Sequence, residues 1–184
     1  DVKRPASVAF VQCAGSWDDN HLSYCSAVCC MGSLKQVRYL RANNEHSRAT
    51  VFHIDIRTVG RLEKFYYDML GDQNVSFVEG KVVEIHEDPE TRNLTLKLGN
   101  TVARESVAES FDMVVLATGI MPNGAGTRFS FELAYDEYGF LSGATGVDGV
   151  YVAGCAKRPC DVSRTTKDAT AAAIKAVQCV NGGN

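Results

Sequence analysis

The chain has 184 residues, of which 45% are hydrophobic and 22% are charged, and its formal net charge is −3. This composition is typical of a globular protein with one large domain or two small ones, and the charge argues against general nucleic-acid binding, which needs a concentrated basic surface. No apolar run approaches the ~20 residues of a membrane-spanning helix, and the first residues lack signal-peptide anatomy. We therefore expect a cytoplasmic protein, and a first residue other than methionine leads us to expect a piece of a longer chain.

The amino-terminal part alternates between strand and helix patterns. A short buried strand is predicted at 7–12, and a polar loop follows at 14–23. Apolar residues at three-residue spacing predict a helix from about 24 to 41. A second strand at 49–56 completes a β-α-β unit, whose strands should be parallel and whose crossover should be right-handed. With a shorter helix at 62–70, this order predicts an α/β architecture with a central parallel sheet.

The remaining sequence continues with short strands and closes on a helix. Alternating residues predict strands at 75–85 and 94–98, which the turn-rich segment 87–90 separates. A continuous apolar run predicts a buried strand at 111–117. The last predicted elements are a strand-like pair at 140–141, a turn and buried strand at 147–154, and an alanine-rich helix from about 165 to 180.

Four of the seven cysteines crowd into eighteen positions: Cys13, Cys25, Cys29 and Cys30. In a reducing compartment such clustering favours metal or redox chemistry over disulfides. Four thiolates are the ligand set of a [4Fe–4S] cluster. Cys25 and Cys29 lie four apart on one face of the predicted helix, with Cys30 beside them, while Cys13 arrives from the end of the first strand. We expect the four sulfurs to converge, and the loop at 14–23 to be disordered or rearranged when no cluster is bound.

Other interpretations of these cysteines stay open. Free cysteines pack as small hydrophobic residues, so the four could be structural thiols. Zinc is a further option, although adjacent cysteines with an eleven-residue gap fit a zinc ribbon poorly. The cysteines occupy the turn and helix start where a nucleotide phosphate would otherwise lie, and a helix amino terminus suits either anion. His21 lies in the same loop but is not predicted as a ligand, because four thiols already complete a set.

Two later segments resemble a known class of protein. The run 111–119, followed by Pro122-Asn123, ends in Ala-Thr-Gly-x-x-Pro-Asn, and the run 148–154 precedes the alanine-rich helix. Both resemble flavoprotein disulfide reductases with two dinucleotide-binding domains, which implies a Rossmann-like parallel sheet with flanking helices. In such proteins the amino terminus of the last helix faces the flavin ring, where its partial positive charge suits an anionic reduced flavin. The resemblance implies that the flavin-contacting residues of this chain are Thr118, Gly119, Gly154, Cys155, Ala156 and Thr165.

Departures from that pattern point to a narrower family. Cys155 stands where those reductases have an acidic residue, and a C-x11-C-x3-C-C run opens a dinucleotide-type helix. With the runs 11–16, 24–31 and 34–36, these residues resemble the A subunits of heterodisulfide reductase over nearly the whole chain. The family implies an electron-transfer oxidoreductase subunit with a [4Fe–4S] cluster and FAD. Its partners would be the other subunits of a heterodisulfide-reductase-like complex, through which the chain could attach to a membrane.

Within that family, Lys157-Arg158-Pro159 suggests the homologue of this subunit in the quinone-interacting membrane-bound oxidoreductase complex. The resemblance assigns no catalytic residue to this chain.

The sequence lacks the glycine-rich turn that cradles a dinucleotide pyrophosphate. The first β-α turn, 12–16, holds one glycine instead of G-x-G-x-x-G. We therefore expect the flavin-binding half-domain to lie upstream of Asp1, the FAD site in this chain to be partial, the isolated chain to be inactive, and NAD(P)H not to bind. The predicted domains are a nucleotide-binding-like domain at 1–121 that carries the cysteines, and the carboxy-terminal part of a flavin domain at 122–184.

Further residues admit both a functional and a structural interpretation. Lys35 could reach toward the flavin or tune the cluster, or be a solvated helix lysine. Cys155 could touch the flavin or be a packed small residue. Cys160 and Cys179 have no obvious partner, and we interpret them as structural. Asp55 and Arg57 are interpreted as a structural ion pair or as a contact with a partner protein.

Two other functions are compatible with the sequence. An NAD(P)H-dependent disulfide reductase would need a C-x-x-C pair, a spacing that the cysteine cluster does not have. A non-catalytic interaction module that has lost its cofactors would bind no iron.

Overall fold

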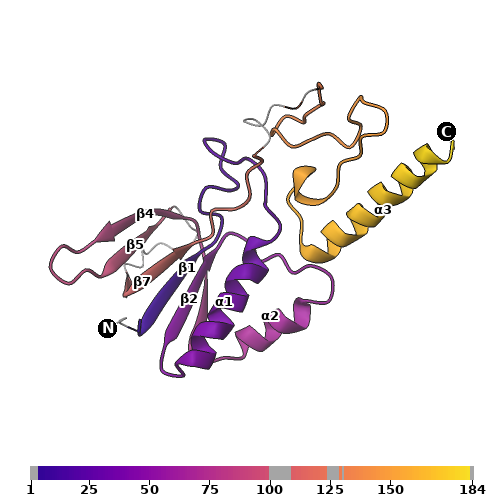
Figure 1. The fold of residues 1–184 in the computed structure, drawn as a ribbon. Coiled ribbons are helices and arrows are strands. Elements are labelled where there is room, and N and C mark those ends of the chain that lie inside the picture. The colour runs from indigo at the N-terminus through magenta and orange to yellow at the C-terminus, as the bar shows by residue number, and fades with distance from the viewer. Residues whose placement is uncertain (1–3, 100–108, 124–128, 130, 183–184) are drawn as a thin grey trace. The chain divides into compact units, whose positions relative to one another are not determined.

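The computed structural model describes residues 4–99, 109–123, 129 and 131–182 (Figure 1). The chain divides into two compact units. Unit 1 comprises Asp1–Cys25 and Cys29–Gly119, and unit 2 comprises Ser26–Val28 and Ile120–Asn184. What each of the predicted domains, 1–121 and 122–184, binds stays a prediction.

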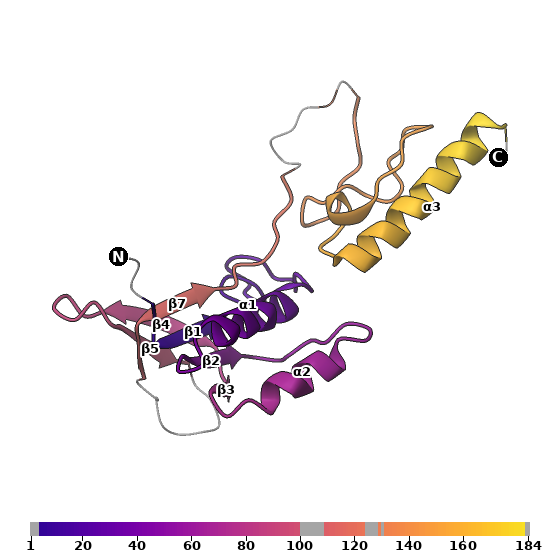
Figure 2. The same cartoon turned by 60° about the horizontal axis from the view of Figure 1, so that its bottom comes forward.

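A parallel four-stranded sheet forms the centre of unit 1. Its strands are β1 (Ser7–Val11), β2 (Arg48–His53), β3 (Val75–Glu79) and β7 (Met113–Leu116), in the spatial order β3-β2-β1-β7 (Figure 2). Phe10 of β1 lies opposite Val51 of β2 on one side and Val115 of β7 on the other. The predicted parallel β-α-β unit is therefore confirmed. Because β2 and β7 flank β1 on opposite sides, the strand order reverses beside β1, which in open α/β sheets is where ligands bind.

Two helices, α1 (Cys29–Asn43) and α2 (Glu63–Leu70), pack on one face of this sheet (Figures 1 and 2). Successive side chains of a strand point to opposite faces. Val8 and Phe10 of β1 accordingly share one buried cluster with Leu34 and Val37 of α1, both of which are fully buried. The three-residue apolar spacing in the sequence therefore marks the face of α1 that packs against the sheet.

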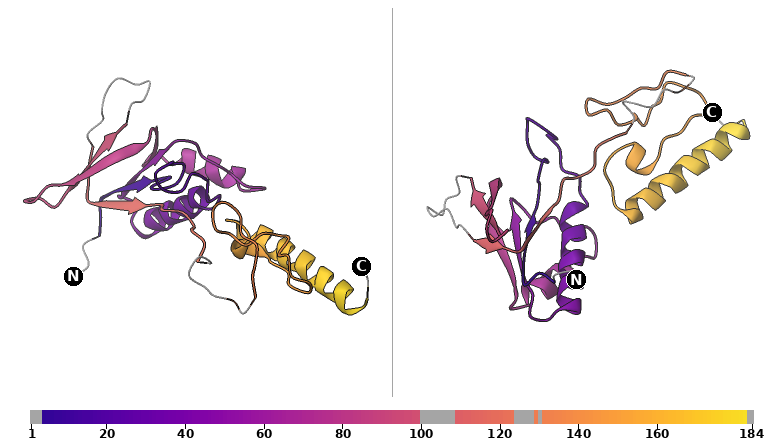
Figure 3. Two further views of the ribbon diagram at one scale, coloured as in Figure 1. Left: turned by 90° about the horizontal axis from the view of Figure 1, so that it is seen from above. Right: turned by 60° about the vertical axis from the view of Figure 1, so that its left-hand side comes forward.

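The opposite face is covered by an antiparallel sheet of three strands, β4 (Val82–Glu87), β5 (Leu94–Leu98) and β6 (Ser110–Phe111) (Figure 3). Ala9 and Val11, the alternate residues of β1, cluster here with Leu96 of β5. The rings of Phe52 and Phe111 meet edge to face with centroids 5.8 Å apart. Unit 1 is thus a three-layered α/β structure in which both faces of the central strands β1 and β2 are buried, as is typical of parallel strands.

The strand predicted at 75–85 is two strands that belong to different sheets. β3 pairs in parallel with β2, whereas β4 pairs antiparallel with β5. The backbone turns at Gly80, whose N–H donates to the carbonyl of His53 at 2.8 Å. Alternation looks alike in both strands, so the sequence pattern did not show the change of sheet. The strand predicted at 49–56 also ends earlier, at His53.

The run predicted as one buried strand at 111–117 is likewise divided, at Asp112. Oδ2 of Asp112 accepts hydrogen bonds from the backbone N–H groups of Ala6 and Ser7, at 2.8 and 2.9 Å. Before it β6 pairs with β5, and after it β7 pairs with β1. The expectation of burial is wrong for Met113 and Leu116, which are 43% and 50% exposed. Their strand β7 lies at an edge of the parallel sheet, where packing is incomplete.

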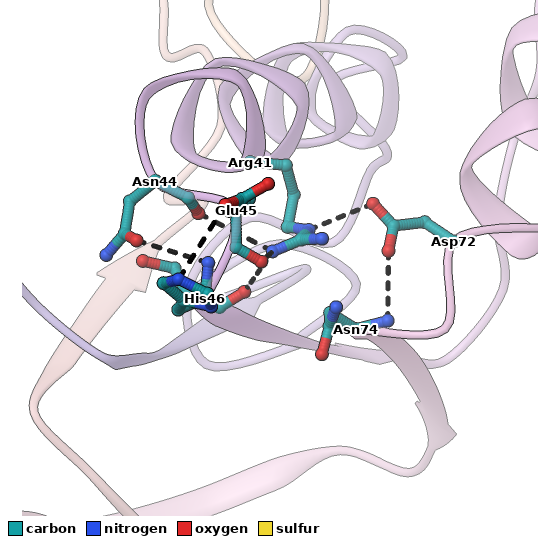
Figure 4. A network of polar contacts seen from close by, with 7 residues as sticks. Arg41, Asn44, Glu45, His46, Asp72 and Asn74 are labelled. Atoms are coloured by element: carbon teal, nitrogen blue, oxygen red, sulfur yellow. Dashed lines mark hydrogen bonds and ion pairs between the residues drawn. The ribbon is translucent and has the colours of Figure 1, made fainter.

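A polar network fixes the carboxyl end of α1 to the start of the neighbouring strands (Figure 4). Nε of Arg41 donates to Asp72 at 2.9 Å, and Nη1 donates to the backbone carbonyls of Ser47, at 2.7 Å, and of Glu45. Asp72 also accepts from the backbone N–H of Asn74 at 2.9 Å. The guanidinium lowers the pKa of the Asp72 carboxyl. Arg41 thereby fixes the turn that leads α1 into β2.

Unit 2 is centred on the helix α3 (Val162–Val180), drawn in yellow in Figure 1. It begins three residues before the predicted start because Asp161 caps it, accepting a hydrogen bond from the backbone N–H of Arg164 at 2.8 Å. None of the helices in the described residues combines the length and the apolar character that crossing a membrane requires. The strand-like pair at 140–141 contributes a fully buried Phe140 and a single bridge between Leu141 and Tyr135.

The buried strand predicted at 147–154 is not a strand in the structure. The segment is half-buried and leads into a short 3-10 helix, η2 (Gly154–Ala156). A strand needs a neighbour whose backbone groups pair with its own. The described residues of unit 2 offer no such neighbour at 150–153.

Candidate functional site

The first candidate site lies at the carboxyl end of β1. Cys13 follows β1, and the N–H of Ala14 donates to the carbonyl of Ala117 just beyond β7, at 3.1 Å. The N–H of Gln12 donates to the carbonyl of Phe52 in β2, at 2.9 Å. Cys13 is therefore held between the ends of β2 and β7, where the strand order reverses.

The loop after Cys13 is ordered by its own backbone hydrogen bonds. Leu22 donates to the carbonyl of Gly15 at 3.0 Å, and Trp17 donates to the carbonyl of Tyr24 at 3.4 Å. Nζ of Lys81, in the same unit, contacts Asp18 at 2.7 Å. These contacts hold the loop in a defined conformation, and the expectation that it is disordered or rearranged when no cluster is bound stays a prediction.

Helix α1 begins at Cys29 rather than near Tyr24, so the placement of Cys25 and Cys29 on one helix face is wrong. Ala27 has a φ of +61°, a left-handed conformation that a right-handed helix cannot include. Cys25 therefore lies in the loop, while Cys29 and Cys30 are the first two residues of α1. Cys13 has a φ of +54°, so the backbone is also strained where the loop begins.

Backbone donors surround the two helix-start thiols. The sulfur of Cys29 accepts hydrogen bonds from its own N–H and from that of Gly119, and the sulfur of Cys30 accepts from its own N–H and from that of Arg57. The Cys30 thiol also lies 3.8 Å from the carbonyl oxygen of Asp55. The sequence did not identify Gly119 and Arg57 as donors to sulfur, because the tertiary fold brings their N–H groups to α1.

The four thiols lie within electrostatic reach of one another. Burial is the largest reason why the pKa of Cys13 rises from 9.0 to about 11, and the charges of the other three thiols raise it as well. The Arg57 guanidinium opposes this rise. Burial also raises the pKa of Cys29 and that of Cys30. These groups form one electrostatic cluster near the carboxyl end of the central strand β1.

This pKa predicts a loss of stability at alkaline pH. In the unfolded chain Cys13 should titrate near its ordinary value of 9.0, so above that pH the unfolded chain releases a proton that the folded chain keeps. The stabilisation is fully present below pH 9 and is lost as the pH rises to about 11. At roughly 1.4 kcal/mol per pKa unit the loss is on the order of 3 kcal/mol. Urea unfolding of the metal-free chain across this interval measures it.

The matched variants are Cys13→Ala and Cys179→Ala. Cys13→Ala should flatten this part of the pH profile, whereas Cys179→Ala should keep it, because Cys179 is exposed and lies in unit 2. A wild-type profile parallel to that of Cys13→Ala would assign the alkaline loss to other groups.

Among the described residues the donor atoms do not stand in metal-binding geometry, since no three cysteine, histidine or acidic side chains there form a group that could hold a metal ion. Convergence of all four sulfurs therefore stays a prediction.

The expected structural ion pair is present, with Nε of Arg57 3.7 Å from Asp55, and the Arg57 guanidinium also lies 4.5 Å from the centre of the Trp17 ring.

Three further predicted cofactor residues belong to unit 1. Thr118 is exposed at the end of the segment that follows β7, and Gly119 has a φ of +93°. Lys35 is exposed on α1, with Nζ 5.6 Å from the centre of the Tyr39 ring. A role for these three residues in flavin binding stays a prediction.

The other predicted cofactor residues lie in unit 2, where η2 packs against the first turns of α3. The N–H of Gly154 donates to Asp168 at 2.9 Å, and Asp168 also pairs with Nζ of Lys157 at 3.1 Å. Gly154 has a φ of +63°, and a Cβ there would lie 2.8 Å from Cγ2 of Thr165. Close packing alone therefore explains the glycine. The sequence analysis did not identify Asp168, because its place fourteen residues after Gly154 shows no contact by itself.

Gly154→Ala should destabilise unit 2 by at least about 2 kcal/mol, because it adds a left-handed alanine and a steric overlap with Thr165. Gly146→Ala is the control: its φ is +76°, but nothing lies within 4 Å of its added Cβ. Urea unfolding of both variants, followed by the helical signal, separates the effect of the steric overlap with Thr165 from the cost of a left-handed alanine. Equal losses in the two variants would show that the contact with Thr165 is unimportant.

The remaining cysteines of unit 2 have partners that the sequence did not indicate. Cys155 is exposed and Cys160 is buried, yet their sulfurs lie 4.0 Å apart. The interpretation of Cys155 as a packed residue is therefore wrong. Cys179, for which the sequence indicated no partner, is exposed and shares a hydrogen bond with the side chain of Tyr151, which raises the pKa of Tyr151. Its interpretation as a structural residue stays a prediction.

Curated relatives match the chain over nearly its whole length, although no protein-family model matches it. The second iron-sulfur A subunit of CoB–CoM heterodisulfide reductase from Methanopyrus kandleri is 31% identical over 195 residues, which cover 100% of this chain and 30% of that protein. The iron-sulfur A subunit of the same enzyme from Methanocaldococcus jannaschii is 34% identical over 187 residues, covering 94% of this chain and 28% of that protein. The chain thus spans less than a third of the length of these relatives.

The fold has a match among solved structures. Lactococcus lactis thioredoxin reductase in its FR conformation has a TM-score of 0.64 over 97% of this chain and 54% of that chain, at 15% sequence identity. At this identity the likeness concerns the fold alone, and it confirms the predicted Rossmann-like α/β class. Sequence relatives named as A subunits of heterodisulfide reductase confirm the narrower recognition. By its sequence, this chain is similar to one part of the A subunits of heterodisulfide reductase.

Proposed function

We propose that the chain is part of an electron-transfer oxidoreductase subunit that relays electrons between flavin and iron–sulfur centres of a heterodisulfide-reductase-like complex. The observation that carries the proposal is that the charges of Cys25, Cys29 and Cys30 raise the pKa of Cys13, which follows β1, while Cys29 and Cys30 begin α1. The names of the sequence relatives support the oxidoreductase class.

The residues that would hold a [4Fe–4S] cluster are Cys13, Cys25, Cys29 and Cys30. When bound, the cluster would supply one-electron transfer. Cys29 and Cys30 lie at a helix amino terminus, where free N–H groups and the helix dipole favour negative charge. Hydrogen bonds to the sulfurs are among the factors that set the potential of such centres, and Gly119 and Arg57 provide them. The donor chemistry therefore fits an iron–sulfur cluster.

Cys25 and Cys13 would complete this ligand set from outside α1. Cys25 lies in the loop that leads to the helix start. Cys13 is buried at the sheet edge, and burial limits the access of water to a bound group. Binding would have to release the thiol protons, which the raised pKa of Cys13 makes costly until a metal replaces them.

On the flavin side, we infer that η2 and the amino-terminal turns of α3 form one wall of a partial FAD site. Cys155 and Ala156 are exposed on η2, and a pocket of about 410 Å³ in unit 2 includes both. Thr165 lies on α3 beside Gly154. The N–H of Gly154 is already bonded to Asp168, so this glycine would contribute its small size rather than a donor.

The partners that we propose are other subunits of such a complex, and the location is the cytoplasm, with attachment to a membrane through those subunits. The closer assignment to the quinone-interacting membrane-bound oxidoreductase complex rests on Lys157-Arg158-Pro159 and stays a prediction.

The experiment is anaerobic reconstitution of the chain with iron and sulfide, followed by iron and sulfide counts and the visible absorption spectrum. Four irons and four sulfides per chain are expected for one [4Fe–4S] cluster. One metal without sulfide would favour zinc-type binding, and no iron would favour an interaction module without cofactors. A disulfide reductase is disfavoured by the adjacent placement of Cys29 and Cys30, which lacks the C-x-x-C spacing.

A further inference from the structure

Two buried polar side chains next to Cys13 lack hydrogen-bond partners. Gln12 and Ser16 are each only 2% exposed. Within the part of the chain that the structure describes, Oε1 and Nε2 of Gln12 and the hydroxyl of Ser16 form no hydrogen bond. Leaving a buried polar group without a partner costs free energy, and the large majority of such groups in proteins are bonded. These two side chains therefore indicate a partner outside the described polypeptide.

Gln12 lies on the face of the parallel sheet that α1 covers. Side chains along a strand alternate between the two faces, and Phe10 of β1 packs in the cluster beneath α1. Gln12 continues this face, since its backbone N–H still follows the sheet by donating to the carbonyl of Phe52 at 2.9 Å. Helix α1 leads from the carboxyl end of β1 to the amino end of β2, which runs parallel to β1. Its first residues, Cys29 and Cys30, therefore lie at the same end of the sheet as Gln12.

Ser16 closes the turn that begins at Cys13. Its backbone N–H donates to the carbonyl of Cys13 at 3.3 Å, and a bridge joins Ser16 to Leu22 in the following loop. The charges of the three other candidate ligands all reach the Cys13 sulfur. Gln12 and Ser16 thus lie before and after the cysteine at which the candidate cluster site is centred.

Both side chains can donate to an anion. The amide of Gln12 carries two N–H donors and the hydroxyl of Ser16 carries one. In the metal-free chain the Cys13 thiol keeps its proton up to a pH of about 11, and a protonated thiol is a weak acceptor. Hydrogen bonds to an ionised acceptor are roughly twice as strong as those between neutral groups. Release of the thiol protons on metal binding would therefore give both donors the acceptor that they lack.

We propose that Gln12 and Ser16 donate hydrogen bonds to the sulfur atoms of a cluster held at Cys13 and thereby raise its reduction potential. Donors at the sulfurs stabilise the reduced state more than the oxidised state, because reduction adds a negative charge. Both residues act through sulfur and are positioning residues rather than ligands of iron. This inference rests on the proposed function, since it requires an iron–sulfur group at this site.

Gln12→Leu and Ser16→Ala remove the donors and leave the four cysteines in place. After anaerobic reconstitution both variants should keep four irons per chain. An anaerobic redox titration, followed by visible absorption and electron paramagnetic resonance, measures the potential. Gln12→Leu should shift the one-electron equilibrium about tenfold toward the oxidised cluster, which lowers the potential by about 59 mV. Ser16→Ala should shift it in the same direction by a smaller factor, because it removes a single donor.

The metal-free chain gives a second readout. Because Gln12→Leu removes an unpartnered buried amide, the urea midpoint of this variant should equal or exceed that of the wild type. Ser47→Ala is the matched control: Ser47 is fully buried just before β2, and its hydroxyl donates to the carbonyl of Pro5 at 2.9 Å. This variant should lower the urea midpoint, and it should leave the potential unchanged because it lies at the amino end of the sheet.

Unchanged potentials in Gln12→Leu and Ser16→Ala, with four irons bound, overturn this inference and leave the proposed function standing. A wild-type chain that takes up no iron overturns both. A urea midpoint of metal-free Gln12→Leu as low as that of Ser47→Ala also overturns the inference, because Gln12 would then be bonded within the fold itself. If Gln12→Leu does not retain its iron, the potential of Ser16→Ala decides.

Discussion

Cys29→Ala should abolish assembly of an iron–sulfur cluster on the chain, with the iron count falling from four per chain to background. Cys29 is the first residue of α1, and its sulfur accepts hydrogen bonds from two backbone N–H groups. Loss of one of four thiolates leaves one iron without its protein ligand, here at the cysteine whose sulfur is held by those two hydrogen bonds. Iron and sulfide counts after anaerobic reconstitution, together with the visible spectrum, measure the effect.

The matched control is Cys179→Ala, which should retain the wild-type iron count. Both variants remove one thiol from the same chain, but Cys179 is exposed near the end of α3. Equal iron loss in the two variants would show that iron binds nonspecifically to thiols. Full retention in Cys29→Ala would remove this cysteine from the ligand set.

The isolated chain should bind FAD with a dissociation constant in the millimolar range or weaker, which is about 4 kcal/mol of net binding. Tight dinucleotide binding depends on a glycine-rich turn whose N–H groups meet the pyrophosphate at a helix amino terminus, and the turn at 12–16 has one glycine. The chain would offer the wall formed by η2 and α3 but no cradle for the pyrophosphate. Most of the entropy cost of association would still apply, at several kcal/mol or more.

Titration of the purified chain with FAD, followed by flavin fluorescence, checks this expectation. Riboflavin is a useful second ligand, because it lacks the phosphates and should bind equally weakly if no phosphate cradle is present. A dissociation constant near or below micromolar for FAD would show a complete site within the chain.

Several features of the fold could be read from local patterns. Leu34 and Val37 were expected on one helix face, and both are fully buried against the sheet. Boundaries were less accurate where one residue changes the backbone course. Because Ala27 has a left-handed conformation, α1 begins later in the sequence than predicted. Asp112 separates β6 from β7 through its hydrogen bonds to Ala6 and Ser7. Neither residue type signals such a role by itself, because the conformation and the partners come from distant segments.

The sequence by itself determined the α/β order of elements and the four cysteines that are candidates for one cluster, because periodicity and spacing are local properties of the chain. Its motifs also carried the resemblance to the A subunits of heterodisulfide reductase. Only the tertiary structure decided which groups surround those cysteines. It brought the N–H groups of Gly119 and Arg57 to the sulfurs of α1, and it buried Cys13 enough to raise its pKa to about 11. It also placed Cys155 beside Cys160, by packing Gly154 against Thr165. Hydrogen bonding, burial and sulfur–sulfur distance depend on segments far apart in the sequence, and folding alone brings them together.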